Sequence, residues 1–201
     1  MEQMIYLRSQ GPPITPENIQ EAVNAPAYVM ASNVRDQQMA DNVLWFLDTL
    51  KPGSKMVIWA ANSHVAHLSE RTATAPASEG GAIPKYRPMG QYLKETLGDD
   101  LYTILSVAYE GNWGVAGVAY QQGEYEPAKP GTLASLLHET GFDAGILDLE
   151  TLYQNEAWPA ASVTVRSNWT VGRTGDLRTL CDALLFIDRM YPSTSVRDGE
   201  P

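Results

Sequence analysis

The sequence has little cysteine, no long apolar run and no cluster of positive charge. Its 201 residues include one cysteine, Cys181, which excludes an intrachain disulfide and is typical of a reducing compartment. No apolar run approaches the roughly 20 residues that span a bilayer. The first residues, Met-Glu-Gln-Met-Ile-Tyr, lack the basic and apolar stretches of a signal peptide. These absences predict a cytoplasmic protein that is not bound to a membrane.

The charge balance and the missing motifs exclude further classes of function. The formal net charge is −10, with acidic residues scattered along the chain, so no basic patch is present to bind nucleic acid. Neither a Gly-x-Ser-x-Gly element nor a phosphate-binding loop occurs, which argues against a serine nucleophile and a nucleotide site. His64 and His67 are three residues apart, but no third ligand accompanies them, so we expect no metal and no cofactor.

The stretch 55–67 combines an apolar run with polar chemistry. Residues 56–60, Met-Val-Ile-Trp-Ala, are apolar at every position, which predicts a strand buried on both faces. Asn62, Ser63 and His64 follow directly. Ligands of open α/β sheets bind beyond the carboxyl ends of the strands, so this pattern predicts a site at this strand end.

The remaining pattern predicts an α/β fold with a mostly parallel sheet and helices on both faces. We expect a helix from a cap at Ser32 or Asn33 to Leu50, with Asp36 in its first turn. Shorter helices are expected at 92–97 and 132–139. Further strands are expected at 101–109, 144–149 and 180–188. Residues 1–30 have no clear role, 31–190 form the domain, and 191–201 form a tail. The Ser-, Thr- and Gly-rich stretch from Ser69 to Pro88 predicts a long surface loop.

Several of these elements, taken in order, resemble a known family. The motifs are Arg35-Asp36-x-x-Met39-Ala40, the strand that ends in Asn62-Ser63-His64, Met89-Gly90, Leu97-Gly98-Asp99, and Asp182-Ala183-Leu184-Leu185. Over roughly residues 30–190 they resemble the later part of the erythromycin esterase family. Several ordered motifs are more specific than any one alone. The resemblance implies an incomplete version of a larger α/β domain.

Two departures from the family pattern bear on activity. The family has two histidines three residues apart at the strand end, and here Ala61 stands at the first position. An earlier Gly-Glu-x-x-His-Gly element, which resembles the source of the family's general base, does not occur in residues 1–30. A lost proton-transfer group costs about 10²–10⁴ in rate. We therefore expect weak or no hydrolysis by this chain alone.

Six residues are candidates for the site. The catalytic candidates are His64, Arg35 and Glu110, and the substrate-binding candidates are Asn62, Asp36 and Trp113. An imidazole transfers protons near neutral pH, and the resemblance implies that His64 orients the site or stabilises charge while Arg35 binds a substrate oxygen or a carboxylate. The alternatives are structural, namely a strand-end histidine that bonds backbone and an ion pair that anchors a helix. His67 is expected at the surface.

The resemblance implies a metal-independent hydrolase that opens a macrolide or another small ester with water. One alternative is a small-molecule-binding module or vestigial fragment without catalysis. The other is one half of a two-chain enzyme, because a partial domain exposes sheet edge and apolar surface that favour a partner chain or a homo-oligomer.

Overall fold

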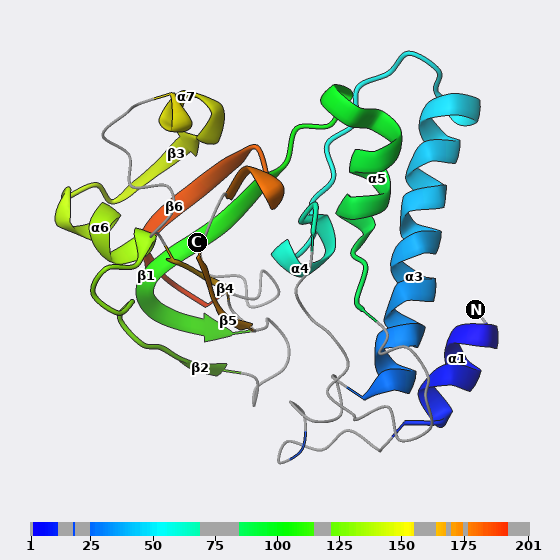
Figure 1. The fold of residues 1–201 in the computed structure, drawn as a ribbon, viewed down its shortest axis with the longest axis horizontal. Coiled ribbons are helices and arrows are strands. Elements are labelled where there is room, and N and C mark those ends of the chain that lie inside the picture. Colours follow the sequence, from blue (N-terminus) through cyan, green and yellow to red (C-terminus); the bar gives the residue numbers. More distant parts are fainter. Residues whose placement is uncertain are drawn as a thin grey trace, which may run out of the picture. The chain divides into compact units, whose positions relative to one another are not determined.

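The computed structural model describes residues 2–11, 18, 25–68, 85–114, 122–154, 164–167, 170–174 and 177–192. It divides into two compact units, Met1–Thr103 and Ile104–Pro201, which are treated separately below (Figure 1). The helix expected near Thr15 and most of the loop expected from Ser69 lie outside the described residues.

The first unit is helical in its described part. Helix α1 (Glu2–Ser9) lies beside the long helix α3 (Pro26–Trp45), which ends in a π-helical turn at Phe46–Leu50 (Figure 1). A one-turn helix, α4 (Asn62–Val65), precedes α5 (Met89–Leu97), and a 3₁₀ turn follows at Gly98–Asp100.

The long helix begins earlier than its sequence predicts. It starts at Pro26 rather than after Ser32 or Asn33, because a proline in the first turn lacks only an N–H that the helix cannot use there. Asp36 consequently lies in the middle of α3 and not in its first turn. This position carries its side chain away from the helix end and into the packing against α4 and α5.

The core of the first unit joins α3 to α5. Ala40, Met89 and Leu93 are buried together, and Gly90 allows the start of α5 to approach α4 closely. A Cβ atom on Gly90 would lie 2.0 Å from the backbone oxygen of Val65. The Met89-Gly90 motif therefore has a packing reason, because one large side chain fills the core while the next position must have none.

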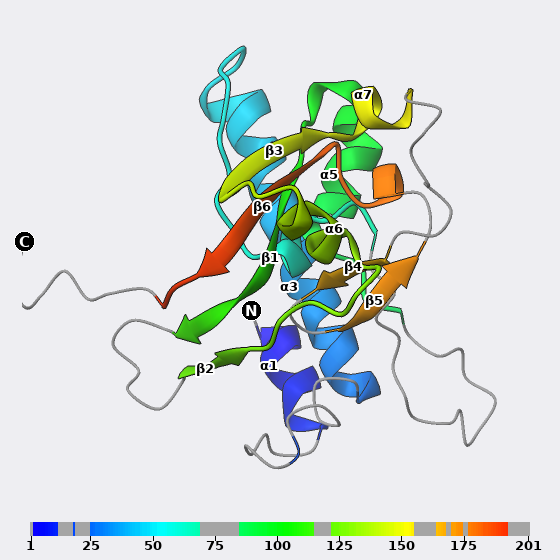
Figure 2. The same cartoon turned by 90° about the vertical axis from the view of Figure 1, so that its left-hand side faces the viewer.

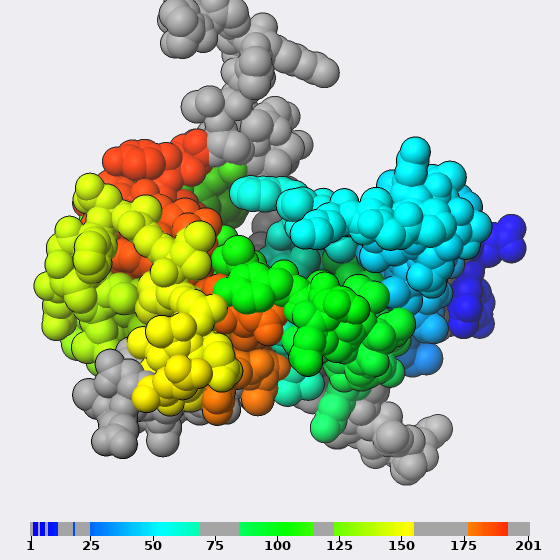
Figure 3. All heavy atoms as spheres, turned by 90° about the horizontal axis from the view of Figure 1, so that it is seen from above, coloured from blue at the N-terminus to red at the C-terminus, as the bar shows by residue number. Residues whose placement is uncertain are grey.

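The predicted strand at residues 56–60 is wrong for this chain. Residues 54–61 form neither helix nor strand, and Val57 and Trp59 are 91% and 95% exposed. Ile58 alone of this run is half-buried, against the core of α3 and α5. No described strand pairs with this segment, so its backbone is left to water and it does not become a strand. In Figure 3 the cyan atoms of this part of the chain lie at the surface.

The second unit contains a four-stranded sheet in the order β2-β1-β6-β3 (Figure 2). The strands are β1 (Ile104–Gly114), β2 (Gln122–Tyr125), β3 (Ala144–Asp148) and β6 (Ala183–Met190). β1 and β6 are parallel, whereas β2 and β3 pair antiparallel with their neighbours. The α/β class is confirmed, and the sheet is mixed, with its one parallel pair at the centre.

Smaller elements complete the second unit. Strands β4 (Thr164–Ser167) and β5 (Thr170–Thr174) form an antiparallel pair. Helix α6 (Leu133–Glu139) is capped by Thr132 and α7 (Leu149–Tyr153) by Asp148, each accepting a backbone N–H three residues on. The core of this unit contains side chains that are at most 2% exposed, among them Leu133, Leu149, Leu184 and Phe186. None of the described helices is both long and apolar enough to cross a membrane.

Candidate active site

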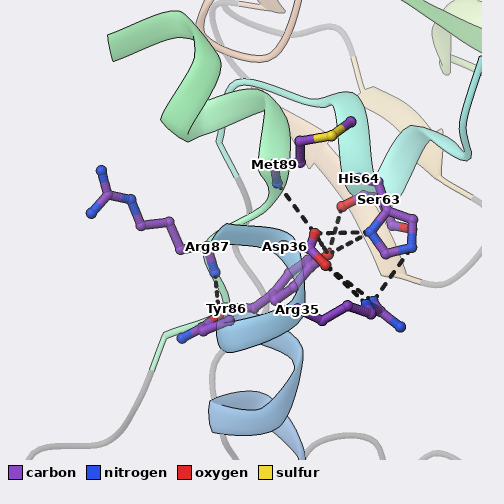
Figure 4. A network of polar contacts seen from close by, with 8 residues as sticks. Arg35, Asp36, Ser63, His64, Tyr86, Arg87 and Met89 are labelled. Atoms are coloured by element: carbon purple, nitrogen blue, oxygen red, sulfur yellow. Dashed lines mark hydrogen bonds and ion pairs between the residues drawn. The ribbon is translucent and has the colours of Figure 1, made fainter. Parts of the chain in front are cut away.

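Three segments of the first unit converge on one carboxylate (Figure 4). Helix α3 supplies Asp36 and its neighbour Arg35, the one-turn helix α4 supplies His64, and the segment that leads into α5 supplies Tyr86. The Asp36 side chain is 0% exposed. A buried carboxylate is tolerated only when hydrogen bonds and opposite charge replace its water, so its partners define the site.

Asp36 accepts hydrogen bonds on both oxygens. Its Oδ2 accepts from Tyr86 Oη at 2.6 Å, from His64 Nδ1 at 2.8 Å and from the backbone N–H of Met89 at 3.2 Å. Its Oδ1 accepts from the Arg35 guanidinium, with the Nε at 3.2 Å. Each partner points toward the carboxylate in Figure 4. The carboxylate therefore holds α3, α4 and α5 together as well as orienting the histidine.

These partners keep Asp36 ionised. Burial raises the pKa of a carboxyl group, but here the hydrogen bonds from His64 and Tyr86 and the nearby positive charge outweigh it. The pKa of Asp36 is lowered from its ordinary value. At neutral pH the site therefore has a fixed, buried negative charge against the imidazole of His64.

The contacts of His64 define its tautomer. Nδ1 faces Asp36 Oδ2, an acceptor, so Nδ1 carries the proton. Nε2 lies 3.4 Å from an Arg35 nitrogen, which has only donors, so Nε2 presents its lone pair. With 24% of its side chain exposed, the imidazole is within reach of a small molecule. The arrangement suits a base that is oriented by a carboxylate.

Arg35 is a partner of the buried carboxylate and is itself partly exposed to solvent. It contacts Asp36 and His64 from the exposed side of the pair, and 44% of its side chain is exposed. A guanidinium has five N–H donors in a rigid fork, so donors remain that can bind an oxygen of a ligand. Arg35 is thus in a position either to cover Nε2 or to hold a carbonyl oxygen beside it.

The remaining predicted site residues are Asn62, Glu110 and Trp113. Asn62 is the first residue of α4, two residues before His64. Glu110 lies in β1 of the second unit, where it forms an ion pair with Arg189 of the neighbouring strand β6. Trp113 follows on β1, and its ring packs over Gly123 of β2. For Glu110 and Trp113, these contacts are structural parts of the sheet.

Tyr86 is the site residue that sequence reasoning missed. It is 4% exposed and its hydroxyl contacts Asp36, the carbonyl oxygen of Ser63 at 3.0 Å and His64 Nδ1 at 3.1 Å. It follows a long stretch of small and polar residues, so no periodicity marks it as buried. Its separation of 50 residues from Asp36 also hides the contact.

The prediction for His67 is wrong, since it is 7% exposed and belongs to the interior. It lies two residues after Val65, the last residue of α4. Among the described ranges, no group of three histidine, cysteine or carboxylate side chains has metal-binding geometry. Cys181 is 0% exposed, and burial raises the pKa of its thiol to about 12, so it is a core residue and not a nucleophile.

The second unit contains another histidine–aspartate pair. His138 Nδ1 donates to Asp188 Oδ1 at 2.6 Å, and the imidazole stacks on Tyr109 with ring centroids 3.8 Å apart. The side chains of His138 and Asp188 are 44% and 25% exposed. This pair attaches α6 to the sheet. The Asp188 side chain is partly exposed to solvent, whereas that of Asp36 is fully buried among its donors.

A histidine oriented by a buried carboxylate is an arrangement that suits general base catalysis. The chain belongs to the erythromycin esterase family, whose sequence pattern matches residues 16–190. It is 31% identical over 96 residues to the Bacillus subtilis (strain 168) protein YbfO, which is named a hydrolase. It is 33% identical over 78 residues to erythromycin esterase type II of Escherichia coli.

Solved structures with this fold include a succinoglycan biosynthesis protein, with a TM-score of 0.58 and 21% identity over 82% of this chain. A mutant of erythromycin esterase EreC in its open conformation has a TM-score of 0.54 and 17% identity over 84% of this chain. The chain spans 39% and 40% of those structures. The matched parts make up 19% of YbfO and 17% of the type II esterase.

Proposed function

We propose that the Asp36–His64 pair is part of an ester-hydrolysing site that acts on macrolactones or other small esters. The observation that carries the proposal is the 2.8 Å contact between His64 Nδ1 and the fully buried Asp36. A hydrogen bond of this kind orients the imidazole and stabilises the imidazolium that forms during catalysis. The relationship to erythromycin esterase type II supports the choice of an ester as substrate.

The proposed reaction uses water as the nucleophile. His64 Nε2 takes a proton from water as the water oxygen bonds to the ester carbonyl carbon, and Arg35 donates to the oxygen that becomes negative. The tetrahedral intermediate then breaks its bond to the alcohol oxygen. That oxygen receives the proton from Nε2, which yields an acid and an alcohol and restores neutral His64. Arg35 must swing from Nε2 for the water to approach.

We propose that turnover by this chain alone is slow. Ala61 has no side chain that transfers a proton, one position before α4, and lost groups of this kind reduce rates by about 10²–10⁴. The side chains of Val57 and Trp59 are apolar and almost fully exposed. We propose that a further polypeptide region covers segment 54–61 in the active form. The solved relatives are larger than this chain, which is consistent with such a covering region.

A second candidate function is binding without catalysis. The absence of an imidazole at Ala61 favours it, because a group that could transfer a proton is missing there while Arg35 keeps donors that can bind an ester oxygen. In that case calorimetry detects binding of a macrolide, Arg35→Ala weakens it, and no product forms.

The experiment that separates the two is a hydrolysis assay with purified protein. Simple esters and macrolides are incubated with wild type and His64→Ala, and products are identified by the added mass of one water. We expect slow turnover by wild type and none by His64→Ala. Equal background rates for both proteins would exclude hydrolysis by this chain.

A further inference from the structure

Tyr86 lies where three hydrogen-bonding groups of the site meet. Its hydroxyl is 2.6 Å from Asp36 Oδ2, 3.0 Å from the Ser63 carbonyl oxygen and 3.1 Å from His64 Nδ1. The hydroxyl has one proton, and the nearest acceptor is the charged Asp36, so the proton goes there. Charge-assisted O–H···O⁻ bonds of this length are among the stronger ones in proteins.

The ring of Tyr86 is held independently of its hydroxyl. It packs against Val29, which is 0% exposed and belongs to α3. The backbone on either side of Tyr86 is held by Asn33, also on α3. The Asn33 side-chain amide donates to the Lys85 carbonyl oxygen at 2.8 Å. The Arg87 backbone N–H donates to Asn33 Oδ1, also at 2.8 Å.

Asn33 and Asp36 are three residues apart on one helix, so both face the same side of α3. α3 therefore holds the tyrosine segment with one residue and receives the tyrosine hydroxyl with the other. The position of the hydroxyl relative to His64 is set by a closed circuit of contacts from Asn33 through Tyr86 to Asp36. Such a circuit constrains the ring of His64 more than the Asp36 bond does alone.

We propose that Tyr86, held by Asn33, is a positioning residue that keeps His64 in the tautomer with Nδ1 protonated. The hydroxyl occupies the space beside Nδ1 that water would otherwise fill, and it lies against the carbonyl of the preceding residue, Ser63. Without it, the N–H of His64 gains alternative partners and the imidazole turns more freely. The proposal rests on the proposed function for its effect on rate, but the effect on the tautomer is independent of it.

The test compares Tyr86→Phe with Tyr28→Phe. Phenylalanine keeps the packing on Val29 and removes only the hydroxyl. Tyr28 is on α3, the helix of Asn33 and Asp36, and its hydroxyl accepts a hydrogen bond from Arg8 at 2.6 Å. The ¹⁵N resonances of His64 are recorded for the neutral imidazole, together with kcat and KM for ester hydrolysis.

In wild type and Tyr28→Phe, His64 should show a single tautomer with Nδ1 protonated. In Tyr86→Phe it should show a mixture of tautomers, and kcat should fall about tenfold to a hundredfold with KM within about twofold. That range is the one found when partners that orient metal-bound histidines are removed. Asn33→Ala should give a smaller change in the same direction.

An unchanged tautomer in Tyr86→Phe would overturn the proposal, whether or not kcat falls, because a loss of rate would then have another cause. Thermal unfolding shows whether the variant folds. If it does not, Asn33→Ala decides, since it keeps the hydroxyl and removes the two backbone contacts. If wild type hydrolyses no ester, the proposed function fails while the ¹⁵N measurement still decides the role of Tyr86.

Discussion

The two histidine–aspartate pairs of this chain have similar contact distances, yet they differ in what surrounds the aspartate. His64 and Asp36 are 2.8 Å apart, and His138 and Asp188 are 2.6 Å apart. The Asp36 side chain is 0% exposed and accepts from four residues, whereas Asp188 is 25% exposed. The distance alone therefore does not distinguish a catalytic candidate from a surface contact.

The surroundings determine what each pair can do. Asp36 is fully buried, so its charge acts on His64 through a fixed geometry and a low local dielectric. Around Asp188 water screens the charge, and the His138 ring is fixed by stacking on Tyr109. The first pair is suited to proton transfer, and the second to attaching a helix.

The largest difference is expected when each aspartate is changed to asparagine. Asp36→Asn leaves Tyr86, His64 and Met89 N–H around a neutral group, so the free energy of unfolding should fall by about 3–5 kcal/mol. Asp188→Asn should lower it by at most about 1 kcal/mol. Urea unfolding of both variants measures this, and equal losses would contradict the distinction between the pairs.

A second imidazole should raise activity only at the buried pair. Ala61→His places one at the start of α4, next to His64, and should raise turnover by up to about 10²-fold. Ala60→His is the matched control, because it adds an imidazole one residue further from α4. Rates are measured with a simple ester. An equal gain from both variants would show that added histidine acts nonspecifically.

The packing around the Asp36–His64 pair should tolerate an added methyl group less well than the packing around the His138–Asp188 pair. Gly90→Ala puts a Cβ atom against Val65, next to His64, and should cost about 1–3 kcal/mol of stability. Gly145→Ala in β3, beside the strand of Asp188, meets nothing within 4 Å and should change stability by less than about 0.5 kcal/mol. Thermal unfolding compares the two, and a stable Gly90→Ala would show that α4 and α5 move apart without cost.

The smallest effect is expected from acid. A carboxyl group whose pKa is lowered in the folded state stabilises the fold above its unfolded pKa of about 3.9, and that stabilisation is lost as the pH falls through the lower folded value. Wild type should therefore lose stability below about pH 4 more steeply than Asp36→Asn. Urea unfolding from about pH 6 down to about pH 3 checks this, and parallel curves would show that Asp36 is not an ionised partner.

Local patterns predicted those parts of the fold whose partners lie within the described chain. The apolar run that forms β6 is paired on both sides, by β1 and β3, and the helix expected at 132–139 is α6. The run at 56–60 has the same apolar character, but burial of a strand depends on its neighbours. With no described strand beside it, Val57 and Trp59 stay in water.

The candidate site was predictable where a sequence motif lay on a regular element. Arg35 and Asp36 are adjacent on α3, and His64 follows in α4, so their motifs and the family resemblance led to a site at this place. Tyr86 lies in an irregular segment, and its burial depends on contacts with Asn33 and Val29 that no periodicity encodes. Glu110 directly follows the strand expected at 101–109, but β1 continues past it and pairs it with Arg189.

The most direct test of the central claim is the rate of ester hydrolysis by His64→Ala measured beside His138→Ala, with both variants shown to be folded. Each substitution removes an imidazole that contacts an aspartate. We predict that His64→Ala reduces the rate by about 10²–10⁴ or to the background, while His138→Ala leaves it within about twofold of wild type. Equal rates for the two variants would contradict this prediction.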